Sequence, residues 1–404
     1  MRIRTKLVIF IILLSILTFL IFGLKPLINH LQIKYAKIEV TLKEDLTLNF
    51  TEEKHVSDFI QSINGTIVDD YIIDSTKIGE KTINFEFIND DGIRLPYEYK
   101  ITIVDKVAPI IWLGDSYSIT VGNNVDLAAK ILCGDNEDGK RYIEGTYDYN
   151  TVGAYPLVYK AVDRSGNEAE KKFTLYVNKK QSSTSQNKPK TYTYFSDVVK
   201  EHKNENTKIG LDVSVWQEDI DFEAIKNAGV EFIIIRVGTT KGPNGEYMLD
   251  SKFTRNIEEA NKYNIDVGIY FYSYANSIEK AREEALWVID HIKDYKVTLP
   301  IAFDWENWDT FNNYNISFFE LTEMAKTFFD TVKVAGYDGL LYSSMNFLEN
   351  FWMLPINYDT WLAHYAKKTS YKGEYTYWQL CSNGKVDGIN GDVDIDIMYL
   401  DKAH

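Results

Sequence analysis

The spacing of hydrophobic and polar residues divides the chain into two kinds of region. In residues 37–105 and 106–178, short runs alternate apolar and polar positions, for example TINFEFI at 82–88 and PLVYKAV at 156–162. Gly, Asn and Asp separate these runs, and alternation of this kind is typical of strands with one buried face. The pattern therefore predicts two small β-sandwich modules, and two tandem copies of one module are the economical interpretation.

The second of these segments resembles the immunoglobulin-like (Ig-like) modules that bacterial surface proteins carry between an anchor and a catalytic domain. The first segment resembles them less clearly. The resemblance implies that both modules are spacers, and a dedicated ligand-binding role is the alternative. Residues 179–207 follow as a predicted linker, since 179–190 (KKQSSTSQNKPK) are polar and contain no apolar core positions.

From residue 208 onward, apolar β-rich runs alternate with longer helical runs. Helices are predicted at 221–228, 251–263, 277–294 and 317–336, after the first four strands, and the last three strands follow one another without helices. Strand-helix alternation indicates parallel strands with right-handed crossovers. The fold class predicted for 208–404 is therefore an α/β irregular TIM-like barrel. The eight predicted strands are 209–216, 231–238, 266–274, 299–306, 339–344, 360–365, 376–382 and 393–399.

The N-terminus carries an uncharged apolar run at residues 7–24, preceded by Arg2, Arg4 and Lys6. At about 1.5 Å per residue, this run is just long enough to cross a hydrocarbon core. No small-residue cleavage site follows it, which favours an uncleaved transmembrane anchor in residues 1–36 over a signal peptide. The expectation is a single-pass protein of the cell membrane with its C-terminal domains outside the cytoplasm. Secretion after cleavage is the alternative.

The composition and net charge exclude some kinds of binding partner. The 404 residues include 59 Asp and Glu against 44 Lys and Arg, a net charge of −15. Such a chain lacks the clustered cations that nucleic acid binding requires. Its two cysteines, Cys133 and Cys381, fall in different predicted domains and are expected to be apolar core residues. The six histidines show no metal-ligand spacing, so neither a metal nor a cofactor is predicted.

Acidic residues gather at the predicted carboxyl ends of three strands. Asp212 lies in the first strand, Asp304 and Glu306 end the fourth, and Asp394 and Asp396 lie in the eighth. In such barrels the reacting groups project from these ends, and residues two apart share a face of a strand. Clustered carboxylates without a metal suit glycoside hydrolysis, which needs one protonated acid and one ionised carboxylate. The alternative is that these groups only cap the barrel or pair with lysines.

Aromatic residues crowd the same strand ends, and sugar rings present apolar C–H faces that pack on aromatic rings. The combination predicts an acidic groove for a polysaccharide. Trp361 and Tyr365 are the best candidates for sugar contact, whereas His364 is assigned no role. The full aromatic set is Trp216, Tyr270, Tyr272, Trp308, Trp361, Tyr365 and Trp378.

Taken together, these motifs resemble glycoside hydrolase family 25, the Chalaropsis-type lysozymes. The resemblance spans residues 208–398, and the joint order of its motifs carries it. The motifs are GLDVSVWQ at 210–217, DSKFTRN at 250–256, GIYFY at 268–272, DWE at 304–306, WLAHY at 361–365, WQ at 378–379 and GINGDVD at 388–394. The resemblance implies a (β/α)5(β)3 barrel and cleavage of the β-1,4 bond between N-acetylmuramic acid and N-acetylglucosamine in peptidoglycan.

The resemblance also implies residue roles. Glu306 is the general acid, Asp304 stabilises the positive charge, and Asp212 and Asp394 orient and tune these two. The implied substrate-binding residues are Tyr270, Tyr272, Trp361, Tyr365, Gln379 and Asp396. Family members commonly carry His at the position of Phe271 and Asn at that of Asp396, so altered substrate contacts or pH range are expected here.

Two other functions compete with this one. A family 18 chitinase-like hydrolase also ends its signature in FDWE, but Leu299 and Ala302 stand where that signature has two of its acids. A catalytically inactive glycan-binding surface protein is the alternative from another class. Four like-charged groups kept together argue against it, because a binding site does not require them. A third hypothesis is that the anchored muramidase opens the cell wall locally for a larger protein assembly of the envelope. This hypothesis is compatible with the enzyme function.

Overall fold

The computed structural model describes residues 24–137, 139–180, 191–353 and 358–403. The chain divides into two compact units, residues 1–106 and 107–404, and each is described by itself. The predicted apolar run at residues 7–24 falls almost wholly on residues 1–23, outside the described ranges.

The first unit consists of a helix and two small sheets. After helix α2 (Leu24–Tyr35), strand β1 (Val40–Leu42) pairs antiparallel with β3 (Ile60–Ile63). A four-stranded sheet has the order β2, β6, β5, β4, namely Thr47–Asn49, Arg94–Val104, Gly79–Asn89 and Gly65–Ile67, with η1 at Val56–Phe59. Alternate side chains of the long hairpin β5–β6 are buried, Phe85, Phe87, Tyr99 and Ile101 among them, which confirms the predicted alternation.

Residues 107–178 repeat this arrangement within the second unit. Strand β7 (Ile110–Ile111) pairs with β9 (Cys133–Gly134), and α3 is Leu127–Lys130. The four-stranded sheet is ordered β10, β11, β12, β8, namely Gly139–Glu144, Gly153–Asp163, Glu168–Asn178 and Ser116–Thr120. In both segments a short strand runs parallel to the second strand of the long hairpin, β2 beside β6 and β8 beside β12. The likeness to immunoglobulin-like modules stays a prediction.

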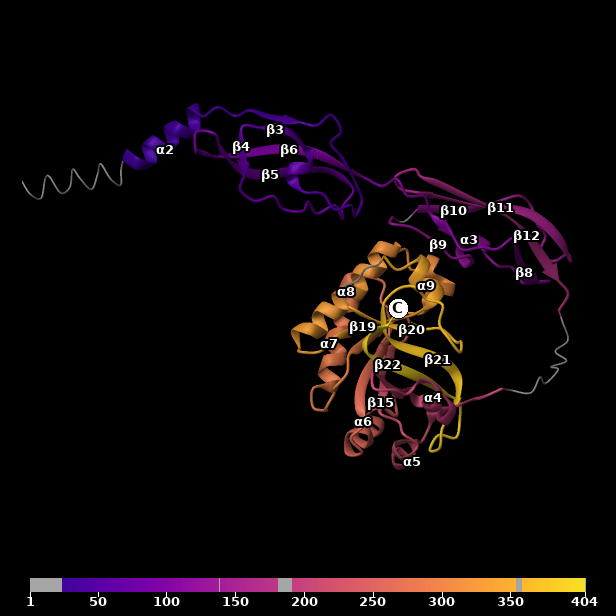
Figure 1. Ribbon diagram of the computed structural model, residues 1–404. Helices are drawn as coiled ribbons and strands as arrows, with labels where there is room; N and C mark the ends of the chain where they lie inside the picture. Colours follow the sequence, from indigo (N-terminus) through magenta and orange to yellow (C-terminus); the bar gives the residue numbers. More distant parts are fainter. Residues whose placement is uncertain (1–23, 138, 181–190, 354–357, 404) are drawn as a thin grey trace, which may run out of the picture. The chain divides into compact units, whose positions relative to one another are not determined.

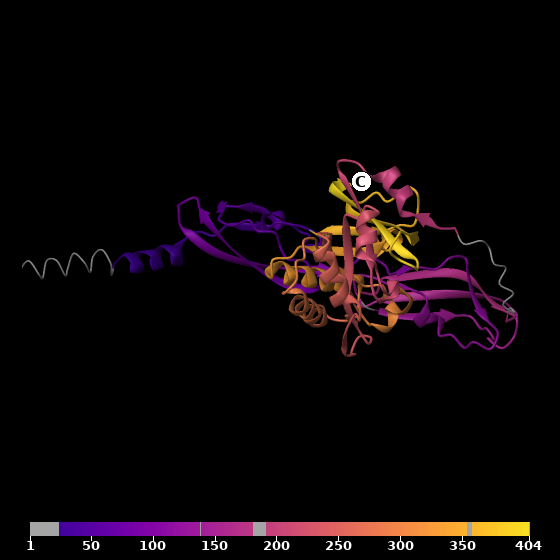
Figure 2. The same ribbon diagram turned by 90° about the horizontal axis from the view of Figure 1, so that it is seen from below.

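Residues 191–403 build a ten-stranded sheet (Figures 1 and 2). Its successive parallel strands are β14 (Thr207–Val213), β15 (Phe232–Thr240), β17 (Asp266–Tyr272), β18 (Ile301–Asp304), β19 (Gly339–Ser344), β20 (Asp359–Ala363) and β21 (Tyr375–Lys385). Strand β22 (Val393–Ala403) pairs antiparallel with both β21 and β14, so the strand path closes on itself. Strands β13 (Thr193–Tyr194) and β16 (Tyr247–Leu249) pair with the ring from outside, on β21 and β15.

Helices follow most of the parallel strands. They are α4 (Phe195–His202), α5 (Phe222–Asn227), α6 (Phe253–Lys262), α7 (Ile278–Ile292), α8 (Phe318–Val334) and α9 (Met345–Asn350), with single turns η2 (Val215–Gln217) and η3 (Asn307–Asn313). Asp221, Ser277 and Ser317 accept hydrogen bonds from the first backbone N–H groups of α5, α7 and α8 and so fix where these helices begin. The four helices predicted in this half are therefore confirmed to within two residues at each end.

Two apolar clusters occupy the two faces of this sheet. Ile234, Ala302 and Leu340 belong to a small cluster inside the closed strand path, together with Trp361. Their sequence neighbours, such as Ile233, Ile301 and Leu341, belong to the large cluster that packs under the helices. The period of two along each strand thus sends alternate residues to the two cores.

The predicted fold class is wrong. It combined a TIM-like α/β barrel with two Ig-like sandwiches and a transmembrane helix, whereas the described residues form a mostly β structure of five sheets. Among those residues, none of the helices has the length and apolar character to cross a membrane. Strand-helix alternation was the basis of the prediction, and it overlooked β13 and β16. It predicted a strand at 393–399 but not that this strand, β22, runs antiparallel to its neighbours, which makes the large sheet a mixed one of ten strands.

Residues 107–178 pack directly on the domain that follows them. The side-chain amide of Asn312, in η3, donates to the carbonyl oxygens of Ala128, Ala129 and Ile131 at 3.1, 3.2 and 2.6 Å. These carbonyls end the short helix α3 and have no partner within it. The Asn312 amide oxygen also accepts from the backbone N–H of Cys133 at 3.3 Å. One buried side chain therefore completes the hydrogen bonding of a helix end in the neighbouring module.

Further contacts at the same interface involve the start of α8 and the residue after α9. The backbone N–H of Phe318, at the start of α8, donates to the carbonyl of Asp135 at 2.8 Å. A Cβ atom at Gly134 would lie 2.7 Å from the Phe318 ring, so only glycine fits there. Trp112 meets Phe351 edge-on, with ring centroids 5.3 Å apart. Residues 107–178 therefore share a packed interface with the residues that follow the predicted linker, and their role as spacers stays a prediction.

Candidate active site

Hydrogen bonds join the segment after β18 to the segment after β17. Asp304 is the last residue of β18, and its carbonyl accepts from the backbone N–H of Ser273 at 2.7 Å. Trp305 is fully buried and donates from its indole nitrogen to the carbonyl of Ala275 at 3.0 Å. Asn307 donates to the carbonyl of Ser273 at 3.0 Å. These bonds fix the backbone on both sides of Glu306, which is itself exposed to solvent.

Asp304 and Glu306 form a coupled acidic pair. Asp304 is buried, and its pKa is raised well above the ordinary value, first by burial and then by the charge of Glu306. Enclosure by the protein also raises the pKa of Glu306. Within the described residues, Oδ1 of Asp304 has no hydrogen-bond partner. Two carboxyls placed so closely resist losing both protons, so the pair retains one proton at a pH where a free carboxyl is ionised.

A second set of acidic residues lies where β22 closes the sheet against β14. Asp212 in β14 lies opposite Asp394 in β22, and burial raises the pKa of both, to about 9 for Asp394. Asp396, two residues along β22, is completely buried and accepts from the indole nitrogen of Trp361 at 2.8 Å. Its charge is the second cause, after burial, that raises the pKa of Asp212.

Gln379 joins this acidic group to the tyrosines. Its amide nitrogen donates to Oδ2 of Asp212 at 2.8 Å. Its amide oxygen accepts from the hydroxyls of Tyr342 and Tyr365 at 2.9 and 3.1 Å. The position of Gln379 is set by β21, where it pairs with Asp396 in the antiparallel register. The network thus reaches Asp212 across β22, which lies between β21 and β14.

The predicted aromatic residues divide into a buried group and a group exposed to solvent. Trp361 is only 2% exposed and packs edge-on against Tyr342 and Tyr270, with ring centroids 4.6 and 6.2 Å apart. Its ring therefore offers little surface to a ligand. Tyr365, 58% exposed, stands at the surface, and Tyr272 is partly exposed at the end of β17, paired with Asp304. Trp308 and Trp378 are buried in the large core, whereas Trp216 is exposed.

The structure thus brings Asp212, Asp304, Glu306, Asp394 and Asp396 together at one end of the closed sheet. Two further residues near them escaped the sequence analysis. Arg236 in β15 lowers the pKa of Asp304 against the larger effect of burial, and its Nε donates to Oδ2 of Asp250 at 2.7 Å. Tyr342 in β19 binds Gln379. The strand period of two could have indicated both residues. Arg236 and Tyr342 lie two residues after Ile234 and Leu340, which face the inside of the closed sheet.

A buried acid supports the site from α7. Glu284 accepts from the Ser273 hydroxyl at 2.6 Å, and burial raises its pKa to about 8. The folded chain therefore holds this proton up to about pH 8, whereas the unfolded chain loses it near the ordinary value of 4.5. Between these values the folded state binds more protons, so its contribution to stability is full below pH 4.5 and is lost as pH rises toward 8.

We expect Glu284→Gln to remove this pH dependence. The wild type should lose up to about 1.4 kcal/mol of unfolding free energy per pH unit in that window from this group. Urea unfolding of the full chain at several pH values between 5 and 8 measures it. The neighbouring exposed Glu283→Gln is the control and should keep the wild-type slope. Equal slopes in wild type and Glu284→Gln would refute the assignment.

Comparison with known proteins identifies the relatives of this region. The model of glycosyl hydrolases family 25 matches residues 211–389. The uncharacterized protein YegX of Escherichia coli strain K12 is 27% identical over 192 residues, which cover 46% of this chain and 68% of that protein. The autolytic lysozyme of Clostridium acetobutylicum is 26% identical over 196 residues, 46% of this chain and 54% of that protein.

Among solved structures, the modular autolysin LytC from Streptococcus pneumoniae in complex with a synthetic peptidoglycan ligand matches with 25% identity and a TM-score of 0.43. The match covers 60% of this chain and 56% of that one.

Proposed function

We propose that this chain, which carries a glycoside hydrolase domain of the lysozyme type, hydrolyses the glycan strands of peptidoglycan. The observation that carries the proposal is the acidic pair Asp304 and Glu306 at the end of β18, facing Asp212 and Asp394 across the mouth of the closed sheet. Glycoside hydrolysis requires a proton donor and a negative charge near one another.

Glu306 is the proton donor in this proposal. It is the solvent-exposed member of the pair, so a glycosidic oxygen can reach it. Enclosure by the protein raises its pKa above the ordinary value, which favours the protonated form that a general acid needs. Transfer of this proton to the leaving oxygen breaks the bond to the ring carbon and leaves the Asp304–Glu306 pair with one more negative charge.

Asp304 lies beneath this reaction and stabilises the positive charge that develops on the ring carbon or on a cyclised 2-acetamido group. Because Asp304 is buried, its charge is poorly screened by water. Asp212 and Asp394 tune the pair through their charges, and Gln379 positions Asp212. Tyr365 and Tyr272 offer partly exposed rings for the sugar, whereas Trp361, Tyr270 and Asp396 act as support.

The bond in the proposal is the β-1,4 linkage between N-acetylmuramic acid and N-acetylglucosamine, which would be met outside the cytoplasm. Support comes from the similarity to a named lysozyme and from the motif order along the chain. How the chain is retained at its target stays a prediction from residues 7–24.

The products of the full chain test this proposal. Purified peptidoglycan should yield fragments that end in reducing N-acetylmuramic acid, identified by mass spectrometry after borohydride reduction. Reducing N-acetylglucosamine ends would keep the hydrolase and overturn the bond. Binding to the wall without any cleavage would instead support the glycan-binding protein.

A further inference from the structure

A short segment outside the matched family region is fastened beside the acidic site. Strand β13 extends the sheet by pairing with the end of β21, Thr193 opposite Gly384 and Tyr194 opposite Lys385. The Asn383 side chain donates to the carbonyl of Thr191 at 2.8 Å, and the Thr193 hydroxyl donates to Asn383 Oδ1 at 3.2 Å. The backbone before α4 is therefore held in place, although it precedes residue 211, where the family match begins.

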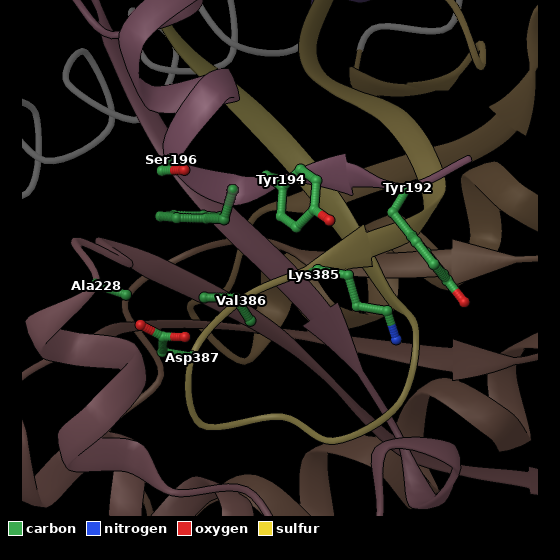
Figure 3. A pocket seen from close by; sticks show the side chains of 8 residues that line it. Tyr192, Tyr194, Ser196, Ala228, Lys385, Val386 and Asp387 are labelled. Atoms are coloured by element: carbon green, nitrogen blue, oxygen red, sulfur yellow. The ribbon is translucent and has the colours of Figure 1, made fainter. Parts of the chain in front are cut away.

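This segment presents two tyrosines to solvent. Tyr192 is 41% and Tyr194 55% exposed. The Lys385 ammonium lies 4.8 Å from the centre of the Tyr192 ring and is itself paired with Asp392 at 3.0 Å. Figure 3 shows the side chains of Tyr192, Tyr194 and Lys385 lining the same hollow. Held rings with exposed surface suit the apolar faces of sugars.

The two tyrosines also line a second hollow, which extends to Tyr365. This groove has a volume of about 580 Å³, in the range of ordinary ligand sites. Tyr365 lines it and donates to Gln379, which in turn binds Asp212. The groove therefore shares Tyr365 with the hydrogen-bond network that holds Asp212. Its remaining polar lining includes Asp197, Glu201 and Lys367.

The lining chemistry suits a hydroxylated ligand. Asp197 and Glu201 are exposed carboxylates that accept hydrogen bonds from hydroxyl groups, and Lys367 is a cation on the same lining. Tyr192 and Tyr194 supply the stacking surfaces. We propose that this groove binds sugar rings of the glycan strand remote from the bond that is cleaved. The proposal rests on the proposed function, since it extends the same substrate along the surface.

The test compares glycan lengths in the full chain. With peptide-free glycan oligomers, kcat/KM of the wild type should rise with length, and Tyr194→Ala should lower it by about fivefold to tenfold on long oligomers. The shortest cleaved oligomer should be unaffected. Tyr176→Ala, an exposed tyrosine on β12, is the matched control and should change neither value. An equal loss on short and long oligomers, or none, would overturn the proposal.

Binding separates this proposal from the proposed function. The dissociation constant of a long peptide-free glycan is measured by calorimetry in the Glu306→Gln background, with and without Tyr194→Ala. A dissociation constant raised about fivefold by Tyr194→Ala supports glycan binding in the groove even if the wild type cleaves nothing. Unchanged binding overturns it even if the wild type is active. A loss seen only with stem-bearing glycan would assign the groove to the peptide instead.

Discussion

Replacing Glu306 with Gln is expected to lower kcat on peptidoglycan glycan by roughly 10²- to 10⁴-fold. The amide keeps the size of the side chain and the exposed position, but it has no acidic proton to give to the leaving oxygen. KM should change little, because the aromatic contacts proposed for the sugar lie on other strands. Release of reducing ends over time measures the effect, with the fold checked by circular dichroism.

Glu246→Gln is the matched control for this substitution. Glu246 is exposed on the loop between β15 and β16, where it pairs with Lys241 at 3.7 Å. Its replacement makes the same Glu-to-Gln change away from the acidic site and should leave kcat at the wild-type value. Retention of more than about a tenth of the activity by Glu306→Gln would remove Glu306 from the role of general acid.

The gathering of carboxylates could be anticipated because strand ends are legible in the sequence. Asp212 and Asp304 follow apolar, β-rich runs, and parallel strands deliver their carboxyl ends to one edge. Asp394 reaches the same edge because it lies at the start of β22, which runs antiparallel to β14. The period of two then placed Asp396 on the face of Asp394. The helix limits were also legible, because Ser277 and Ser317 have the chemistry of N-caps.

The parts that escaped prediction depend on packing between distant segments. Trp361 seemed a sugar platform because it is aromatic and near a strand end, yet its indole is used to satisfy buried Asp396. Asn312 lies in η3, a segment with no amphipathic period, and its partners are about 180 residues away in α3. The barrel element of the predicted fold class failed because local alternation does not report hairpin and edge strands such as β16 and β13. The apolar run behind the predicted transmembrane helix lies almost wholly outside the described residues.

Asn312→Ala is expected to destabilise residues 107–404 by about 3 kcal/mol. The substitution removes one donor from each of three backbone carbonyls at the end of α3 and the acceptor for the Cys133 N–H. The carbonyls of Ala128 and Ile131 keep the Tyr159 hydroxyl as a donor, at 2.9 and 3.4 Å, whereas among the described residues no other donor to the Ala129 carbonyl takes its place. Buried polar groups left without partners cost about 1–3 kcal/mol each, and water that enters the opened interface recovers part of this. Urea unfolding of the full chain measures the loss as a lower midpoint for the transition of this unit.

Asn313→Ala provides the control, because the adjacent Asn313 is exposed and should change stability by less than about 0.5 kcal/mol. Gly134→Val tests the same contact from the other side, since its side chain would run into the rings of Phe318 and Phe311. Asn312→Ala as stable as Asn313→Ala would mean that residues 107–178 do not dock on the hydrolase in solution. If both interface variants are destabilised, the docked module supports the segment that follows Glu306, because Asn312 belongs to η3, whose first residue is Asn307.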